Sequence, residues 1–143
     1  MGRALEAVCV LVVDDDVDAR EMLAMFLGEH GARVVTAKDG AEAIALLEPE
    51  RPNVVLTDLA MRSGDGYDVF RAVREVLGSI PCIAISALPD DGRAREAGFD
   101  LRMEKPIDLD DLLEAIRRTL GPVRQRRSGV RATPRRTRRK KTG

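Results

Sequence analysis

The stretch AVCVLVVDDD, residues 7–16, begins with seven apolar residues and ends in three aspartates. A short uninterrupted apolar run is typical of a central strand of a parallel sheet, because such a strand is buried on both faces. Residues 18–31 then carry apolar side chains at helical spacing, and Gly31 is a stop signal for this helix. The side chains expected on its buried face are those of Met22, Leu23, Phe26 and Leu27.

The same alternation of strand and helix continues to residue 120. Further strands are predicted over residues 32–37, 52–58, 80–86 and 99–104, and helices over residues 39–48, 66–77, 93–98 and 109–120. A turn is expected from Pro49 to Pro52, between the second helix and the third strand. Five strands alternating with helices predict an α/β fold with a doubly wound, five-stranded parallel sheet and helices on both faces.

Charge is distributed unevenly along the chain. There are 24 basic and 24 acidic residues, but ten of the basic residues and none of the acidic ones lie after Gly121. Residues 121–143 also have few apolar side chains to offset the entropy cost of ordering, so we predict a disordered Arg/Lys-rich tail. Residues 1–120 carry the acidic excess and are long enough for one domain with a hydrophobic core.

The two cysteines, Cys9 and Cys82, each lie within an apolar run. This placement favours buried, reduced thiols over a secreted disulfide scaffold. No apolar stretch approaches the ~20 residues that a membrane-spanning helix needs. The sequence therefore predicts a cytoplasmic protein that does not associate with a membrane.

Reactive side chains follow four of the five predicted strands. Asp14 and Asp15 follow the first strand, Asp58 ends the third, Ser86 ends the fourth and Lys105 follows the fifth. Taken singly, each residue has an ordinary interpretation as a helix cap or a solvated loop residue. The carboxyl ends of parallel strands meet at one crevice, however, so we expect these side chains to converge there.

The expected cluster suits phosphoryl transfer. Three crowded carboxylates repel one another, and a hard divalent cation such as Mg²⁺, or Mn²⁺ in its place, relieves that repulsion through oxygen ligands. Lys105 and Ser86 could share the charge that develops on the oxygens of a phosphoryl group. Asp58 is then the candidate nucleophile, forming an aspartyl phosphate.

The motifs VLVVDDD, VVLTDLAMRSGDG, AISA and EKP, in this order, resemble the receiver domain of two-component response regulators over residues 6–120. The resemblance implies a flavodoxin-like strand order of 2-1-3-4-5, phosphoryl acceptance by Asp58 and a cis peptide before Pro106. The other implied roles are a metal-binding acidic pair at Asp14 and Asp15, a backbone carbonyl ligand to the metal at Ala60, a switch hydroxyl at Ser86 and a phosphoryl contact at Lys105.

Two arginines depart from the pattern of that family. Arg62 lies four residues after Asp58, where receivers usually have proline, which predicts a less rigid loop. Arg102 lies three residues before Lys105, where receivers usually have Tyr, Phe or His as the partner of the switch hydroxyl. We interpret Arg102 as a solvent-facing strand residue, with an altered output switch as the alternative.

Two further departures concern hydrolysis and the fourth helix. Ala60 and Leu88 occupy the positions that commonly modulate water attack on the phosphoryl group, and neither side chain can orient water by hydrogen bonding. A slowly hydrolysed phosphoryl group is therefore expected. The segment from Ser86 to Lys105 is shorter than in most receivers by about one helical turn, which predicts a short fourth helix.

The predicted function is that of a single-domain response regulator, and not of an enzyme, since it would catalyse only its own phosphorylation and dephosphorylation. Its phosphoryl donor would be a sensor histidine kinase or a phosphotransfer protein. Residues 121–143 would contact nucleic acid or an acidic protein, or remain a solvated charge run. The alternative is a nucleic-acid-binding protein with the receiver as regulator or scaffold. A haloacid-dehalogenase-type phosphatase is disfavoured, because it needs a second aspartate where this chain has Ala60.

Overall fold

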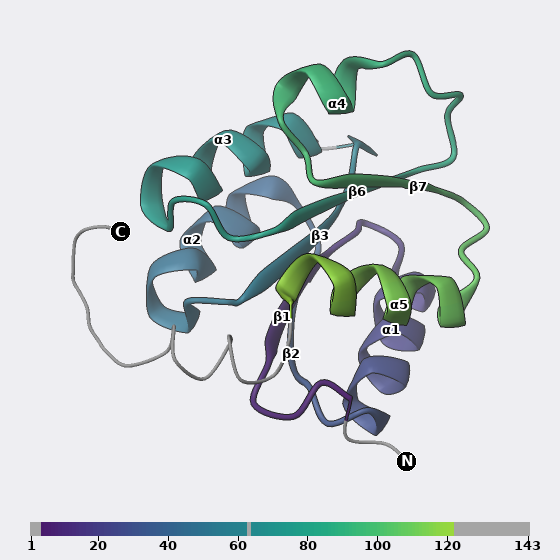
Figure 1. The fold of residues 1–143 in the computed structure, drawn as a ribbon. Coiled ribbons are helices and arrows are strands. Elements are labelled where there is room, and N and C mark those ends of the chain that lie inside the picture. Colours follow the sequence, from purple (N-terminus) through teal and green to yellow (C-terminus); the bar gives the residue numbers. More distant parts are fainter. Residues whose placement is uncertain (1–3, 63, 122–143) are drawn as a thin grey trace.

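The computed structural model describes residues 4–62 and 64–121, which form a parallel sheet with helices on both faces (Figure 1). The order of the strands in the sheet is β2-β1-β3-β6-β7. In chain order these strands are β1 (Cys9–Val13), β2 (Arg33–Ala37), β3 (Val54–Asp58), β6 (Cys82–Ser86) and β7 (Leu101–Glu104). Counted among themselves they follow the order 2-1-3-4-5, which confirms the predicted doubly wound, flavodoxin-like fold.

The helices divide between the two faces of the sheet (Figure 1). One face is covered by α1 (Val17–Glu29) and α5 (Leu109–Leu120). The other is covered by α2 (Gly40–Glu50), α3 (Gly66–Val76) and α4 (Arg93–Ala97). The five residues of α4 confirm the prediction of a short fourth helix.

Strand β1 shows why the apolar runs of the sequence become central strands. Val10 and Val12 pack in the core under α1 and α5, whereas Leu11 and Val13 pack in the core under α2 and α3. All four side chains are at most 1% exposed. Burying an aliphatic side chain of this size contributes about 1.5–3 kcal/mol, so a strand that is apolar on both faces is stable only where helices cover both.

Aspartates begin three of the helices. The side chains of Asp16, Asp39 and Asp108 accept hydrogen bonds from backbone N–H groups in the first turns of α1, α2 and α5. Such a cap contributes about 1 kcal/mol to helix stability. Asp16 is thus a helix cap, although it directly follows the two aspartates of the candidate site.

The structure corrects two local predictions. Pro49 lies inside the last turn of α2, and the chain leaves the helix only at Arg51, which has a left-handed backbone. Met22 is 48% exposed, whereas Leu23 and Leu27 are buried, so the apolar face of α1 is narrower than predicted. The sequence also gave no sign of the two-residue antiparallel strands β4 (Ala60–Met61) and β5 (Gly64–Asp65). The predicted disordered tail lies, apart from Gly121, outside the described residues.

Candidate functional site

The sheet brings the predicted site residues to one edge. Asp14 follows β1, Asp58 ends β3, Ser86 ends β6 and Lys105 follows β7. The strands β1, β3, β6 and β7 are adjacent and parallel, so these four residues come from neighbouring positions at the carboxyl ends of the strands. Asp14, Asp58 and Ser86 are 3%, 7% and 1% exposed, so three polar side chains are buried at this edge of a mainly apolar interior.

Lys105 joins two of the carboxylates. Its Nζ atom lies 3.0 Å from Oδ2 of Asp14 and 3.1 Å from Oδ2 of Asp58. Burial lowers the pKa of the Lys105 ammonium, but the hydrogen bonds and charges of Asp14 and Asp58 outweigh burial, so the pKa is raised above its ordinary value. Lys105 therefore carries a positive charge at neutral pH. The peptide bond that follows it, to Pro106, is cis, as the resemblance implied.

Asp14, Asp15 and Asp58 form an acidic cluster. Each offers one carboxylate oxygen, and these three oxygens lie within 4.8 Å of one another. Hard oxygen donors in such a group match the preference of Mg²⁺ and other hard divalent cations. The donor set thus fits the predicted metal.

The loop after β3 reaches back to this cluster. The backbone N–H of Arg62 donates to Oδ2 of Asp15 at 2.9 Å, and Nε of Arg62 lies 3.6 Å from the same oxygen. The backbone hydrogen bond, followed by the guanidinium charge, holds the pKa of Asp15 below its ordinary value. The sequence marked Arg62 as a missing proline, but it gave no sign of this contact to Asp15.

Two close contacts fix the chain on either side of this loop. The Ala60 N–H donates to Oδ1 of Asp58 at 3.0 Å, and the Gly66 N–H donates to the Leu59 carbonyl at 3.1 Å. A Cβ atom on Gly66 would collide with the carbonyl oxygen of Asp58. The start of α3 therefore lies directly against the end of β3, which is possible because Gly66 has no side chain. The role of the Ala60 carbonyl as a metal ligand stays a prediction.

Ser86 is held by the loop that follows it. Its Oγ atom accepts a hydrogen bond from the Leu88 N–H at 3.0 Å, and its carbonyl accepts one from the Lys105 N–H at 2.9 Å. A hollow of about 520 Å³ lies beside Ser86, and its lining includes Ala60, Leu88 and Arg102. Ala60 and Leu88, the two apolar residues that were predicted to affect hydrolysis, thus border the same hollow as Ser86.

Arg102 does not face solvent, so our first interpretation of this residue was wrong. Its side chain is 12% exposed, donates a hydrogen bond to the Leu88 carbonyl and lies 3.8 Å from Asp90. Long arginine stems can bury against a protein surface while the guanidinium finds polar partners. The sequence around Arg102 carries no information about the loop that reaches this strand, so it could not show the contact with the Leu88 carbonyl.

Arg20 is a contact that the sequence did not signal. Its Nη1 atom donates to the backbone carbonyl of Asp14 at 2.8 Å, from one turn into α1. This guanidinium adds positive charge close to the acidic cluster. Arginine at this place in a helix has no distinctive pattern, so structure was needed to find it.

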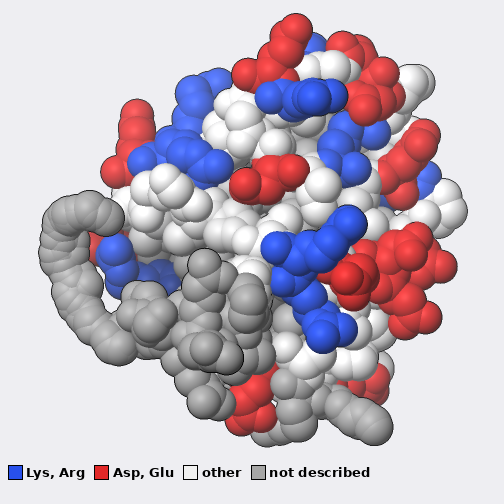
Figure 2. Space-filling view, viewed as in Figure 1, with Lys and Arg blue, Asp and Glu red and all other residues white. Residues whose placement is uncertain are grey.

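The surface of the domain carries charges of both signs. In Figure 2 the described residues present acidic and basic side chains next to one another, without one broad basic patch on this face. No helix within residues 4–62 and 64–121 is both long and apolar enough to span a membrane.

Comparison with known proteins places this site in a family. The model of the response regulator receiver domain matches residues 10–117. An uncharacterized 14.6 kDa protein of Leptolyngbya boryana is 37% identical over 112 residues, covering 75% of this chain and 86% of that protein. The transcriptional regulatory protein GlrR of Escherichia coli is 36% identical over 110 residues, covering 75% of this chain but 25% of GlrR.

A solved structure gives a third comparison. The receiver domain of the sensor histidine kinase PA1611 from Pseudomonas aeruginosa, with a magnesium ion coordinated in its active site cleft, has a TM-score of 0.73 and 26% identity, covering 80% of this chain and 98% of that domain. The chain belongs to the response regulator receiver family. Receiver domains are signalling domains of two-component systems, which is consistent with the expectation that this protein is not an enzyme acting on separate substrates.

Proposed function

We propose that this chain is a single-domain response regulator that accepts a phosphoryl group on Asp58. The observation that carries the proposal is the position of the Lys105 ammonium, which joins the buried carboxylates of Asp58 and Asp14 at 3.1 and 3.0 Å. A cation that touches the nucleophile can also contact the group that the nucleophile receives. Lys105 would therefore move from a resting partner of Asp58 to a partner of the phosphoryl oxygens.

The donor would be a phosphohistidine on a sensor histidine kinase or phosphotransfer protein. A carboxylate oxygen of Asp58 forms the new P–O bond while the P–N bond to the donor imidazole breaks and its electron pair stays on the nitrogen. The Ser86 hydroxyl and the Lys105 ammonium would bind the equatorial oxygens, where negative charge accumulates. Because Asp58 is 7% exposed, the resulting acyl phosphate would form largely out of bulk water.

Asp14, Asp15 and Asp58, with the Ala60 carbonyl, would hold a divalent cation. Mg²⁺, or Mn²⁺ in its place, would supply positive charge that offsets repulsion between these carboxylates and an anionic phosphoryl group. The receiver domain of PA1611 has a magnesium ion in its active site cleft, which supports this assignment.

The experiment is phosphorylation of the full chain by acetyl phosphate in the presence of Mg²⁺, followed by intact-mass measurement. We expect a single phosphate-sized mass gain in the wild type and none in Asp58→Asn or without a divalent cation. Asp110→Asn, which changes an exposed aspartate in α5, is the matched control and should be labelled like the wild type. Labelling of Asp58→Asn at the wild-type rate would refute the proposal.

A second proposal concerns residues 122–143, which lie outside the described residues. We propose that this segment binds nucleic acid through phosphate contacts, because it has ten basic residues and no acidic residue. We keep the division between a receiver domain over residues 1–120 and a tail over residues 121–143 as part of this proposal. An acidic protein partner is the competing outcome.

Duplex DNA binding by the full chain, measured by fluorescence anisotropy at increasing salt, tests the second proposal. Affinity should fall steeply and linearly in a plot of log K against log salt concentration, with a slope of about −0.9 for each phosphate contacted. Repeating the titration with phosphorylated protein and with Asp58→Ala separates a regulated interaction from a constitutive one. Absence of binding at low salt would refute nucleic-acid contact.

A further inference from the structure

The peptide units that flank Leu88 connect two functional side chains. The Leu88 N–H donates to Oγ of Ser86 at 3.0 Å, and the Leu88 carbonyl accepts a hydrogen bond from Nη2 of Arg102. Ser86 is 1% exposed and lies at the end of β6, next to Asp58 at the end of β3. The backbone of Leu88 thus lies between the guanidinium of Arg102 and the Ser86 hydroxyl beside the candidate phosphoacceptor, with one hydrogen bond to each.

The bond from Leu88 determines what the Ser86 hydroxyl can do. A serine hydroxyl has one proton to donate and lone pairs that accept. Because the Leu88 N–H already occupies an acceptor position on Oγ, the proton of Ser86 remains available for an anionic oxygen. Fixing Leu88 therefore orients Ser86 as a donor toward a group on Asp58.

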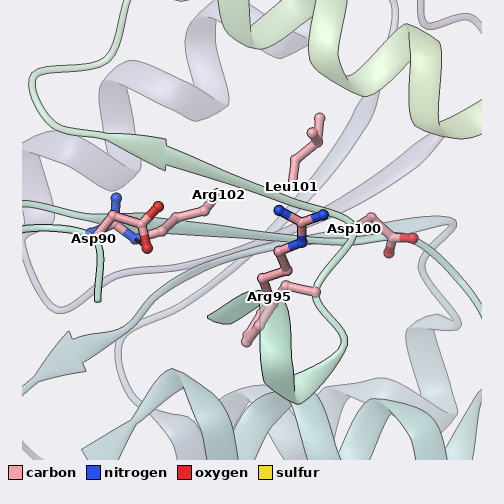
Figure 3. Close-up of a pocket in the computed structure, with 6 residues that line it drawn as sticks. Asp90, Arg95, Asp100, Leu101 and Arg102 are labelled. Carbon is pink, nitrogen blue, oxygen red and sulfur yellow. Dashed lines mark ion pairs between the residues drawn. The ribbon is translucent and has the colours of Figure 1, made fainter. Parts of the chain in front are cut away.

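Arg102 makes its polar contacts at the rim of two hollows. It borders two hollows, one of about 520 Å³ that it shares with Leu88 and one of about 420 Å³ that it shares with Arg95. In Figure 3, Arg102 and Asp90 extend toward each other, while Arg95 rises from α4 toward Leu101. In this position the side chain of Arg102 is 12% exposed, donates to the Leu88 carbonyl and lies 3.8 Å from Asp90.

We propose that Arg102 is a positioning residue for Ser86 and acts through the backbone of Leu88. The guanidinium fixes the Leu88 carbonyl and so restrains the backbone of Leu88, which keeps the Leu88 N–H oriented toward Ser86. The hydroxyl is then in place before a phosphoryl group arrives, which lowers the cost of ordering it during transfer. This inference rests on the proposed function, because it assigns Arg102 a part in phosphorylation of Asp58.

The charge of Arg102 also attracts Asp90, which an apolar side chain could not do. Asp90, on the same loop as Leu88, lies 3.8 Å from Nε of Arg102. The side chain of Asp90 is 63% exposed, so salt screens this attraction. The position of Leu88, and with it the orientation of Ser86, should therefore depend more on the hydrogen bond to the carbonyl than on the ion pair with Asp90.

The test uses the full chain with three variants. Arg102→Met keeps a long side chain without a donor, Arg102→Lys keeps one ammonium donor, and Arg95→Met changes the arginine that lines the neighbouring hollow. The readouts are hydrogen exchange of the Leu88 amide in the unphosphorylated protein, the initial rate of labelling by acetyl phosphate, and the dissociation constant for Mg²⁺ by calorimetry. A dispersed amide spectrum establishes that each variant is folded.

We expect Arg102→Met to speed exchange of the Leu88 amide and to slow labelling by about tenfold, the effect of one charge-assisted hydrogen bond. The Mg²⁺ dissociation constant should remain within about twofold, because the contacts of Arg102 are with Leu88 and Asp90 and not with the acidic cluster, and salt screens charges beyond about 8–10 Å. Arg102→Lys should restore part of the slow amide exchange and part of the labelling rate. Arg95→Met should match the wild type in both. A purely space-filling role would leave Arg102→Met, with its similar bulk, close to the wild type in both readouts.

Other outcomes would overturn the inference. Unchanged exchange and labelling in Arg102→Met, or an equal loss in Arg95→Met, would refute a positioning role for Arg102 while leaving phosphorylation of Asp58 intact. A wild-type chain that takes up no phosphoryl group would instead refute the proposed function, and the role of Arg102 in transfer with it. The labelling of the wild type thus distinguishes the two failures.

Discussion

The ammonium of Lys105 lies 3.1 Å from a carboxylate oxygen of Asp58, and the same nitrogen lies 3.0 Å from Asp14. Removing the cation leaves two buried carboxylates facing each other, so we expect Lys105→Gln to lower the free energy of unfolding by about 1–3 kcal/mol in the presence of a chelator. Removing one partner of a fully buried ion pair lowers stability by about 3–5 kcal/mol. We expect a smaller loss here because the Lys105 side chain is 26% exposed. Denaturant unfolding measures the change.

Lys38→Gln is the matched control for this substitution. Lys38 lies 3.9 Å from Glu42 in an exposed pair, which should contribute at most about 1 kcal/mol. The pKa of Lys105 is raised in the folded state, so its contribution should be present at pH 7 and be lost as the pH rises beyond about 10.4, the ordinary pKa of lysine. Equal losses in the two variants would contradict the prediction.

We expect the guanidinium of Arg62 to compete with a divalent cation for Asp15, because it lies beside the same carboxylate. Arg62→Ala removes the Nε atom that lies 3.6 Å from Oδ2 of Asp15 and keeps the backbone N–H that donates to the same oxygen. Because the Arg62 side chain is 91% exposed, the gain should be small. We expect the dissociation constant for Mg²⁺ to fall by about two- to fivefold, the equivalent of an exposed ion pair.

Isothermal titration calorimetry gives this constant directly. Arg71→Ala, which removes an arginine paired with Asp68 on α3, serves as the control and should bind Mg²⁺ like the wild type. Weaker Mg²⁺ binding by Arg62→Ala than by the wild type would show that Arg62 assists the metal site and does not compete with it.

Ala60 borders the hollow next to Ser86, and its side chain has no hydrogen-bonding group that could orient a water molecule. We expect the phosphoryl group on Asp58 to be hydrolysed faster in Ala60→Asn, because an amide can position water. One added hydrogen bond of about 1 kcal/mol in the transition state corresponds to about a fivefold change in rate. The decay of the phosphorylated mass measures the lifetime.

Ala60→Val adds bulk without a hydrogen-bonding group and is the control for this experiment. It should retain the long lifetime of the wild type or extend it. If Ala60→Asn and the wild type lose the phosphoryl group at the same rate, the explanation based on water orientation fails.

The sequence predicted the fold well because the local pattern of apolar residues determines here which strands are central in the sheet and which faces of them are covered. The run that became β1 is apolar on both faces, and Val12 and Val13 pack on opposite sides of the sheet as that pattern requires. The errors are local. Pro49 was taken as the start of a turn but lies in the last turn of α2, and Met22 lies just outside the face of α1 that carries the buried Leu23 and Leu27.

In the candidate site, the positions of the side chains could be predicted from the sequence, but the backbone hydrogen bonds could not. The convergence of Asp58, Ser86 and Lys105 could be predicted, because parallel strands place their carboxyl ends together. The contacts of the Arg62 N–H with Asp15, and of the Leu88 N–H with Ser86, could not, because every residue except proline has the same N–H group. What the sequence lacks is the path of the two loops that carry these donors.

Gly66 sits where the start of α3 meets the end of β3. We expect Gly66→Ala to lower the free energy of unfolding by about 1–3 kcal/mol, the usual effect of overpacking, because its Cβ would collide with the Asp58 carbonyl. Gly28→Ala is a sharp control, since a Cβ there meets no atom within 4 Å and the residue lies in α1. Gly28→Ala should stabilise the protein by up to about 1 kcal/mol. If Gly66→Ala and Gly28→Ala changed stability in the same direction, the explanation based on the collision at Gly66 would be contradicted.

Cys82 provides a test of burial through pH. Burial raises the pKa of its thiol to about 12, whereas an unfolded cysteine ionises near pH 8.5. The folded state therefore holds a proton that the unfolded state releases, and this contribution to stability is complete below pH 8.5 and is lost as the pH rises toward 12. Over that window stability should fall by about 1.4 kcal/mol per pH unit from this group alone. Between pH 8 and pH 10, denaturant unfolding should show a larger loss of unfolding free energy for the wild type than for Cys82→Ala. The cavity in the variant lowers its stability at both pH values and does not affect this comparison.

In the native protein at pH 8, the thiol of Cys82 should resist a disulfide reagent that reacts rapidly once the chain is unfolded. Rapid reaction under native conditions would show that β6 is open to solvent.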